Sequence, residues 1–329
     1  LRKHLEGKGV HFRSQTDSEV IPHLIAGAYE GDLLSAVAAA LKQLDGTYGI
    51  AVISSLEPGV VVTARKGSPI VIGLGEGENL VASDIAALLP YTRQVIYLND
   101  GDIAAITADK VDLRNIQNVP VEREVAKIDW DAGQAEKGNY PHFMLKEIFE
   151  QPKTIVDCIR GRINPETYDV ILSGIMDNRE RFLNARRIIF VACGTSWHAS
   201  LIGEHLIESI CRIPVEVEYA SEFRYRNPII REDDIVIAVS QSGETADTLA
   251  AVELARKAGA FVFGICNVVG SSIARATDSG AYIHVGPEIG VASTKAFTGQ
   301  VTVMAMLALA VGRERGTVTE AYYNEVSAA

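Results

Sequence analysis

"IVIAVSQSGETADTLAAVELA", residues 235–255, is the stretch that decides the fold. It begins with five apolar residues, continues into a polar turn at 240–245, and ends with apolar residues at helical spacing. A nearly continuous apolar run is typical of a strand buried on both faces, and such strands belong to parallel sheets. The stretch therefore predicts a buried strand, a hydroxyl-rich turn and a helix.

Four further apolar runs in residues 187–329 repeat this texture, and helical patterns separate them. They are "IIFVAC" (188–193), "VEVEY" (215–219), "FVFGIC" (261–266) and "AYIHV" (281–285). Alternating strands and helices specify a parallel, doubly wound sheet. We therefore expect residues 142–329 to form an α/β domain with leading helices.

Residues 49–107 have a different texture, in which short strands alternate with tight turns. Strands joined in this way pair antiparallel. Helical patterns at 33–44 and 84–89 flank or interrupt the block. Gly73, Gly75 and Gly77 imitate a nucleotide-binding loop, but the residues after them alternate like a strand, so we predict a hairpin.

The charged segment 119–141 has little periodicity and is predicted to link a first domain at 1–118 to a second at 142–329. A helical pattern resumes at His142, and Pro152 inside it predicts a break or a second helix start. The apolar run at 301–311 is shorter than the roughly 20 residues that a membrane span needs, so it predicts a buried helix.

Composition limits the possible functions. The chain has 329 residues, of which 47% are hydrophobic and 22% charged, as expected for about two globular domains. A net charge of −11 argues against a nucleic-acid surface, because phosphate backbones demand clustered Lys and Arg. The four cysteines form no CxxC pair and indicate reduced, structural thiols in a cytoplasmic protein, and the seven histidines lack metal-ligand spacing.

Polar turns rich in small residues follow three of the predicted strands. They carry Thr195 and Ser196, then Ser240, Gln241, Ser242 and Thr245, and finally Ser293. In a parallel sheet these turns meet at one edge, where α/β proteins bind ligands. Helix N-termini and hydroxyl donors make an anion site without any cationic side chain. A helix cap would explain one such turn, but three at one edge favour a ligand site.

Four motifs in this half of the chain resemble the glutamine–fructose-6-phosphate aminotransferase family. They are "CGTS" (193–196), "ASEFRYR" (220–226), "SQSGETADTL" (240–249) and "EIGVASTKAFT" (288–298). The N-terminal half resembles the family's glutaminase domain and linker in "RSQTDSEVIPHL" (13–24), "GSPIVIGLGEGENLVASD" (67–84) and "HFMLKEIFEQP" (142–152). The resemblance implies an αββα Ntn-hydrolase sandwich followed by a sugar isomerase (SIS) domain.

The resemblance also implies ligands for particular residues. Asp17 would receive the α-ammonium group of glutamine, although a helix N-cap is the alternative interpretation. Fructose 6-phosphate or glucosamine 6-phosphate would bind at Thr195, Ser196, Ser240, Gln241, Ser242, Thr245, Val291 and Ser293. Lys295 is expected to make a structural ion pair, because the family places its Schiff-base lysine further downstream.

The same resemblance predicts an internal fragment with no catalytic residues of its own. The family's glutaminase nucleophile is an N-terminal cysteine, whereas this chain begins with Leu1, and a second SIS domain would supply the proton-transfer groups. The parent protein, a homodimer, would convert glutamine and fructose 6-phosphate to glutamate and glucosamine 6-phosphate without cofactor or metal. The rival hypothesis is a non-enzymatic SIS-domain sensor of phosphosugars, which leaves the strand-rich N-terminal half unexplained.

Overall fold

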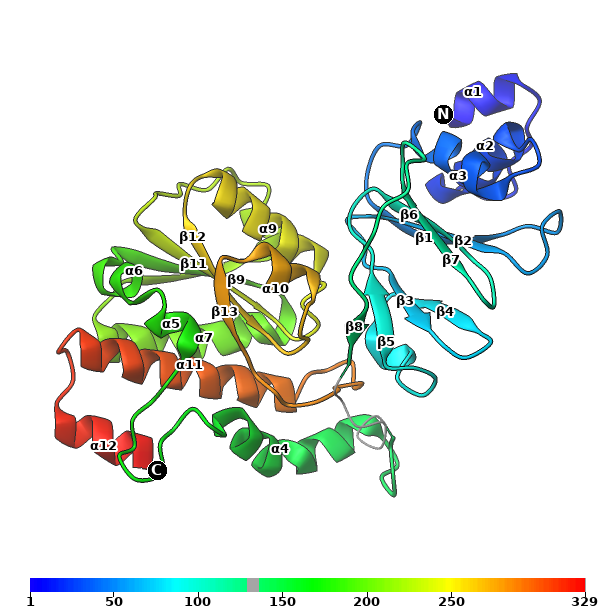
Figure 1. Cartoon of the computed structure of the whole chain (residues 1–329). Coiled ribbons are helices and arrows are strands. Elements are labelled where there is room, and N and C mark those ends of the chain that lie inside the picture. The colour runs from blue at the N-terminus through cyan, green and yellow to red at the C-terminus, as the bar shows by residue number, and fades with distance from the viewer. Residues whose placement is uncertain (129–135, 329) are drawn as a thin grey trace. The chain divides into compact units, whose positions relative to one another are not determined.

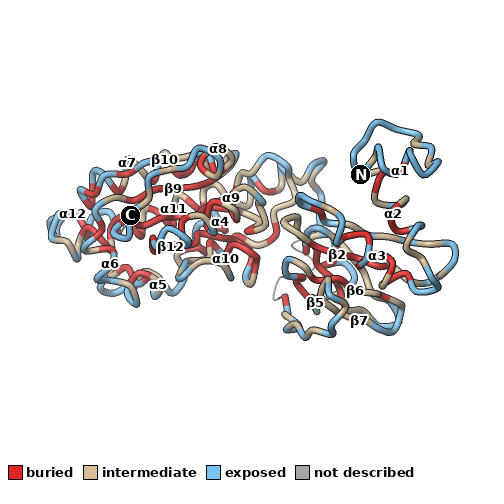
Figure 2. Tube along the Cα trace, turned by 90° about the horizontal axis from the view of Figure 1, so that it is seen from above, coloured by how far each residue is buried: buried red, intermediate tan, exposed pale blue. Residues whose placement is uncertain are grey.

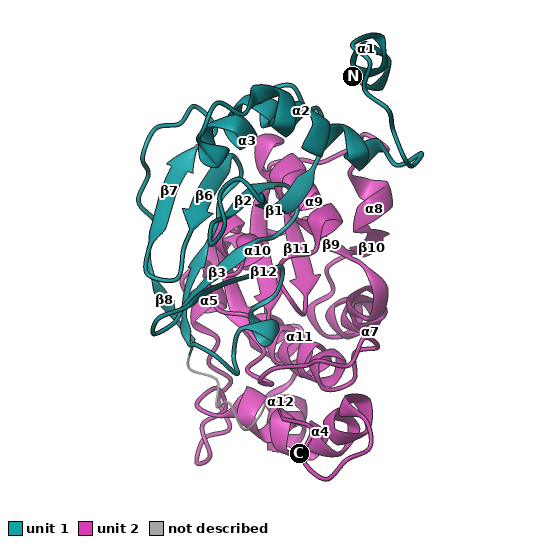
Figure 3. Cartoon of the chain, turned by 90° about the vertical axis from the view of Figure 1, so that its right-hand side faces the viewer, with its two compact units in different colours: residues 1–129 teal, residues 130–329 magenta. Residues whose placement is uncertain are grey.

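The computed structural model describes residues 1–128 and 136–328 (Figure 1). The chain divides into two compact units, Leu1–Asp129 and Trp130–Ala329 (Figure 3). Each unit buries apolar side chains in cores of its own, which is what an independently folding domain requires.

Two antiparallel sheets of four strands form the first unit, and their orders are β1-β2-β6-β7 and β4-β3-β5-β8. The strands are β1 (Tyr48–Ile53), β2 (Val61–Lys66), β3 (Val71–Leu74), β4 (Asn79–Ala82), β5 (Gln94–Tyr97), β6 (Asp102–Ile106), β7 (Val111–Asn115) and β8 (Ala126–Lys127). Its helical segments are α1 (Arg2–Gly7), η1 (Asp17–Glu19), α2 (Val20–Ala28), α3 (Leu33–Leu41) and η2 (Ile85–Ala87).

The first unit is layered. Helices α2 and α3 bury Leu24 and Val37 in one core with Val62 of the first sheet. Ile72 of the second sheet and Ile106 of the first belong to a second core, so the two sheets pack face to face. Leu88, just after η2, lies against β3 at Gly73. Gly73 follows Ile72 in the strand, so it faces the other side of the sheet, away from that second core. The order of layers is therefore helices, sheet, sheet and the η2 turn, which confirms the predicted αββα type of sandwich.

Two details of this unit refine the prediction. The glycines at 73–77 do form a hairpin between β3 and β4, in which the Gly75 N–H donates to the Glu78 carbonyl at 3.0 Å. The pattern at 84–89 predicted a helix, whereas the structure has the single 3₁₀ turn η2, with Asp84 accepting from the Ala86 N–H at 2.7 Å.

The second unit is built on a five-stranded parallel sheet with the order β10-β9-β11-β12-β13. These strands are β9 (Arg187–Ala192), β10 (Val215–Tyr219), β11 (Asp234–Ser240), β12 (Phe261–Cys266) and β13 (Ser279–Tyr282). The helices are α4 (Phe143–Ile159), α5 (Ser173–Met176), α6 (Arg179–Asn184), α7 (Gly194–Cys211), α8 (Ala220–Phe223), α9 (Ala246–Lys257), α10 (Ser272–Ala276), α11 (Lys295–Glu314) and α12 (Glu320–Ala328). The predicted doubly wound sheet is confirmed.

Helices cover both faces of this sheet. Ile235 and Ile237 of β11 join the core that includes α7 and α11, whereas Val236 and Ala238 join the core that includes α9 and α10. The central strands and α11 are largely red in Figure 2, the colour of buried residues. By length and composition, helix α11 could cross a membrane. However, 67% of its apolar 18-residue window is buried inside the protein, as expected for a core helix.

Helix α4 contradicts one prediction. It runs without interruption from Phe143 to Ile159, although Pro152 lies inside it. Proline removes one backbone N–H, so the carbonyl of Ile148 loses its partner four residues along. The Gln151 side chain donates to that carbonyl through Nε2 at 3.0 Å, which compensates the loss and allows the helix to continue.

Two boundaries differ from the sequence pattern. Strand β13 ends at Tyr282 instead of 285, because Asn267 takes over pairing beyond it by accepting from the Val285 N–H and donating to the Gly286 carbonyl. The segment 119–141 begins as part of the first unit, since β8 pairs with β5 and Arg123 bonds Asp102. The predicted linker also includes residues 129–135, which lie outside the described part of the chain, so the domain boundaries stay a prediction.

Candidate functional site

The order of the parallel sheet creates a place for a ligand between β9 and β11. The chain leaves β9 for β10 on one side and then returns to β11 on the other, so the connections diverge between these two neighbours. Such a switch point opens a crevice at the carboxyl ends of the two strands. The polar turns after β9 and β11 both begin at this crevice, as the sequence predicts.

Three hydroxyl side chains define the turn 240–245. Ser240 Oγ accepts from the Gly243 N–H at 3.0 Å and lies 3.1 Å from Thr245 Oγ1. Ser242 Oγ accepts from the Glu244 N–H at 3.1 Å. The backbone therefore uses the oxygens of Ser240 and Ser242 as acceptors. Ser242 keeps a hydrogen that it can donate to a ligand, and the Ser240–Thr245 pair keeps one, because one of these two hydroxyls donates to the other.

Thr245 stands at the N-cap of α9, but its hydroxyl makes no capping hydrogen bond. The ordinary explanation for a threonine at this position is that it satisfies the first helical N–H groups. Here those groups keep their hydrogen-bonding capacity, and the helix dipole adds about half a positive charge. Hydroxyls and a helix N-terminus thus combine into an anion site.

Charged side chains near this turn are already committed to partners. Glu244 Oε1 accepts from the Ser272 N–H at 2.8 Å, so this carboxylate serves the start of α10. Arg224 of α8 pairs with Asp247 in the first turn of α9 at 2.8 Å. The positive character of the turn therefore comes mainly from backbone dipoles, which agrees with the absence of Lys and Arg from residues 240–245.

The predicted residues of the first turn, Thr195 and Ser196, lie in the first turn of α7. Thr195 is half-buried and Ser196 is 6% exposed. Cys193 is the N-cap of this helix and makes no side-chain cap bond, so the N-terminus of α7 resembles that of α9. Gln241 is half-buried, and its carbonyl accepts from the Asn267 N–H at 3.3 Å.

The third turn, before α11, differs from the first two. Glu288 accepts from the backbone N–H groups of Thr294 and Ala296 at 2.8 and 3.1 Å, and from Ser293 Oγ at 2.7 Å. A carboxylate of the protein therefore occupies the anion position at this N-terminus. Val291 is fully exposed, and no contact joins Val291 or Ser293 to the turn 240–245 within the described residues. Their assignment to the sugar stays a prediction.

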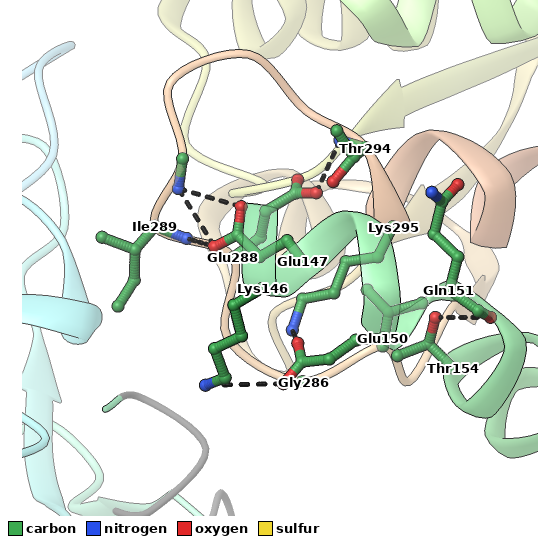
Figure 4. Close-up of polar contacts among 12 residues, drawn as sticks. Lys146, Glu147, Glu150, Gln151, Thr154, Gly286, Glu288, Ile289, Thr294 and Lys295 are labelled. Atoms are coloured by element: carbon green, nitrogen blue, oxygen red, sulfur yellow. Dashed lines mark hydrogen bonds and ion pairs between the residues drawn. The ribbon is translucent and has the colours of Figure 1, made fainter. Parts of the chain in front are cut away.

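Sequence reasoning missed the acidic residues of α4 that hold this loop (Figure 4). Glu147 is 2% exposed and accepts from the backbone N–H groups of Ile289 at 2.6 Å and Gly290 at 3.1 Å. Glu150 pairs with Lys295 at 2.7 Å. Nothing in the pattern of residues 143–159 distinguishes the buried Glu147 from the more exposed Glu150, so the sequence carried no usable signal.

Lys295 behaves as expected. Its side chain is 3% exposed, and its Nζ bonds Glu150, which Lys146 also approaches at 3.4 Å. The expectation of a structural ion pair is confirmed.

In the first unit, Asp17 opens the 3₁₀ turn η1 and is exposed. Its carboxylate accepts no hydrogen bond in the described part of the chain, so Asp17 does not act as a helix cap. Glu19 supports the turn instead by accepting from the Arg13 and Ser14 N–H groups at 2.6 and 2.7 Å. These bonds, with that from the Ser14 hydroxyl, lower the pKa of Glu19 to about 2.

All four cysteines are free. Burial raises the pKa of Cys158 to about 11 and the pKa values of Cys211 and Cys266 to about 12, so these three thiols stay protonated at neutral pH. The residues that the structure describes contain no group of three potential metal ligands.

Two protein families match separate parts of the chain. A glutamine amidotransferase domain matches residues 1–90, and a SIS domain matches residues 181–310. The second match contains the turns after β9 and β11, and the first contains Asp17.

Curated relatives match nearly the whole chain. It is 59% identical to a glutamine–fructose-6-phosphate aminotransferase [isomerizing] of Bacteroides thetaiotaomicron over 98% of this chain and 53% of that protein. It is 55% identical to the corresponding protein of Chlorobaculum tepidum over 96% of this chain and 52% of that protein. The chain thus spans about half the length of these relatives.

A solved structure, the C-terminal domain of glucosamine-fructose-6-phosphate aminotransferase from Francisella tularensis, aligns with a TM-score of 0.55 and 36% identity. The alignment covers 58% of this chain and 53% of that one. Together these matches confirm the resemblance in the motifs: over nearly its whole length the chain is similar to glutamine–fructose-6-phosphate aminotransferases, and it combines a match to a glutamine amidotransferase domain with a match to a SIS domain.

Proposed function

We propose that the second unit binds fructose 6-phosphate or glucosamine 6-phosphate at the carboxyl ends of β9 and β11. One observation carries the proposal, namely that the hydroxyl of Thr245 stands at the N-terminus of α9 without capping it. With Ser240 and Ser242 it offers donors to a phosphate dianion. Thr195, Ser196 and Gln241 border the same crevice, and Val291 and Ser293 are assigned to the sugar by resemblance.

Calorimetric titration of the chain with fructose 6-phosphate tests the site. Ser242→Ala removes one donor to the ligand, together with the hydrogen bond that Ser242 Oγ accepts from the Glu244 N–H. We expect affinity to fall roughly ten- to a hundredfold, as for a hydrogen bond to a charged group. Ser209→Ala is the matched control, because it removes an exposed hydroxyl of α7 that bonds only the Leu206 carbonyl. An unchanged dissociation constant for Ser242→Ala would contradict the assignment of Ser242 to the phosphosugar site.

We further propose that the first unit contributes to glutamine binding through Asp17, whose free, exposed carboxylate suits an ammonium group. In a full-length protein with measurable glutaminase activity, Asp17→Asn should raise the KM for glutamine about tenfold or more. Phosphosugar isomerisation should be spared. Asp109→Asn removes the same charge from an exposed turn of this unit and serves as the control. A KM that stays the same would exclude the pairing.

The whole protein would accordingly convert fructose 6-phosphate and glutamine to glucosamine 6-phosphate and glutamate, as a cytoplasmic homodimer without nucleic-acid or membrane partners. The four free cysteines, three of them buried, support a reducing compartment. The match of residues 1–90 to a glutamine amidotransferase domain supports an enzyme over a non-enzymatic phosphosugar sensor. Phosphosugar binding by a full-length protein that neither hydrolyses glutamine nor forms glucosamine 6-phosphate would favour the sensor.

A further inference from the structure

The hydroxyl of Ser196 has an unusual position between α7 and α11. Its Oγ accepts a hydrogen bond from Gln300 Nε2 at 2.9 Å, and both residues are buried. A serine hydroxyl has one hydrogen to donate and two lone pairs. Because the Gln300 amide uses a lone pair, the hydrogen of Ser196 remains to be directed elsewhere.

Within the described residues no acceptor takes this hydrogen. Serine inside a helix commonly donates to the carbonyl four residues back, and Ser200 does so to the Ser196 carbonyl at 2.8 Å. For Ser196 the residue four back is Ala192, which ends β9 and lies outside the helix. The hydrogen of Ser196 therefore has no acceptor within the described residues, and Ser196 lies in the first turn of α7, just after the carboxyl end of β9.

The orientation of the Gln300 amide follows from its surroundings. Gln300 is 1% exposed, and its Oε1 has no hydrogen-bond partner in the part of the chain that the structure describes. Turning the amide over would leave the whole NH₂ group buried without an acceptor. Orphaned buried N–H groups are rarer in proteins than under-satisfied carbonyl oxygens. The amide therefore donates to Ser196 and does not accept from it.

Close packing of the two helices fixes this contact. Gly203 of α7 faces Met304 of α11, and a Cβ at Gly203 would overlap the Met304 sulfur. Met304 lies one turn beyond Gln300, and Gly203 lies two turns beyond Ser196, so all four residues share one interface. The close approach of α7 and α11 at Gly203 and Met304 therefore holds together the two helices that carry Ser196 and Gln300.

We propose that Gln300 is a positioning residue of the sugar-phosphate site, whose amide obliges the Ser196 hydroxyl to donate its hydrogen to the bound phosphosugar. The inference rests on the proposed function. It adds a residue that touches no ligand itself and acts only through Ser196.

A double-mutant cycle with fructose 6-phosphate as the probe tests this role. In the full 329-residue chain, Ser196→Ala and Gln300→Leu should each weaken binding roughly three- to tenfold, the value of one neutral hydrogen bond. The double variant should bind no more weakly than Ser196→Ala alone, because Gln300 has nothing left to orient. Met304→Leu changes the same interface without changing polarity, and its affinity should match the wild type.

Gln300→Glu supplies a readout that a packing role would not change. A protonated carboxyl can donate to Ser196 as the amide does, whereas a carboxylate cannot. Relative to the wild type, its affinity should therefore stay near normal wherever the carboxyl is protonated, and fall as the pH rises through its pKa. The elements packed against α11 carry other titratable groups: Lys146, Glu147, Glu150, Lys153, Asp157 and Cys158 on α4, and His198, Glu204, His205, Glu208 and Cys211 on α7. Helix α11 itself carries Lys295, and Glu288 binds its first turn. All of them are present in the wild type and in every variant, so the comparison with the wild type at each pH isolates the carboxyl group at position 300.

The outcomes separate the two proposals. Independent, multiplicative effects of Ser196→Ala and Gln300→Leu would overturn the positioning role, as would a Gln300→Leu chain that binds like the wild type. A Gln300→Glu chain as weak as Gln300→Leu at every pH would do the same. If the wild-type chain binds no phosphosugar, the proposed function itself fails, and the inference fails with it.

Discussion

Gly243 is the residue on which the shape of the turn 240–245 depends. Its φ is +66°, and a Cβ there would overlap the Ser271 side chain. Its N–H donates to Ser240 Oγ, and its carbonyl accepts from the Ile273 N–H. A larger residue would therefore have to displace Ser271 or shift the backbone of the turn, whose Gly243 N–H is bonded to Ser240 Oγ.

We expect Gly243→Ala to weaken fructose 6-phosphate binding at least tenfold and to lower the free energy of unfolding by more than the roughly 1–2 kcal/mol of left-handed strain alone. Gly316→Ala is the matched control. Gly316 has a φ of +67° in the same unit, but nothing lies within 4 Å of a Cβ there. Denaturant unfolding and calorimetry on both variants separate the backbone cost from the clash. Equal losses of stability and affinity in the two variants would contradict the role given to Ser271.

The sequence was sufficient to predict the hydroxyl residues, but not the hydrogen-bond partners that determine whether each hydroxyl is available to a ligand. Spacing after a buried strand was enough to predict Ser240, Ser242 and Thr245 near one helix N-terminus. The same reasoning grouped Ser293 with them, and there Glu288 already fills the anion position. Contacts between residues far apart in sequence, such as that of Gln300 with Ser196, leave no local pattern to recognise.

At the scale of elements, the junction of α4 with the loop before α11 depends on one buried carboxylate. Glu147 serves two part-buried backbone N–H groups, those of Ile289 and Gly290. A Cβ at Gly290 would meet Glu147 Oε2 at 2.5 Å, so the loop approaches this side chain closely. The loop that leads into α11 is therefore attached to α4 mainly through Glu147.

We expect Glu147→Gln to lower the free energy of unfolding of the second unit by about 1–3 kcal/mol, because an amide presents one acceptor oxygen where two carboxylate oxygens stood. Hydrogen exchange of the Ile289 and Gly290 amides should become faster, which locates the effect in the loop. Glu166→Gln, at an exposed position, is the control and should change neither quantity. Unaltered exchange in Glu147→Gln would show that the loop is held by other contacts.

The elements themselves were largely predictable. Buried parallel strands and short antiparallel strands have distinct hydrophobic patterns. The parallel and the antiparallel sheets of the structure are found where the corresponding patterns occur in the sequence. Errors arose where a side chain substitutes for a backbone hydrogen bond. Gln151 allows α4 to pass Pro152, and Asn267 ends the pairing of β13 early. Such compensation depends on three-dimensional contacts and cannot be read from propensity.

At the scale of the whole molecule, the two units differ in architecture and in proposed ligand. The first combines antiparallel sheets with an exposed Asp17, and the second a parallel sheet with the turns after β9 and β11. Each has its own hydrophobic cores, so each should unfold as its own cooperative transition. A ligand that binds one unit should then stabilise that unit alone.

We therefore expect scanning calorimetry of the chain to resolve two transitions, of which Glu147→Gln lowers only the one that belongs to the second unit. Fructose 6-phosphate at 100 times its dissociation constant should stabilise that unit by about 2.7 kcal/mol. For a unit of this size the same transition should rise by about 5–10 °C while the other stays in place. At the same ligand concentration the Ser242→Ala chain, with its ten- to hundredfold weaker affinity, should be stabilised by only about 0.4–1.4 kcal/mol and show a rise no more than about half as large. A rise in the transition that Glu147→Gln leaves unchanged would place the phosphosugar in the strand-rich unit and contradict the site at β9 and β11.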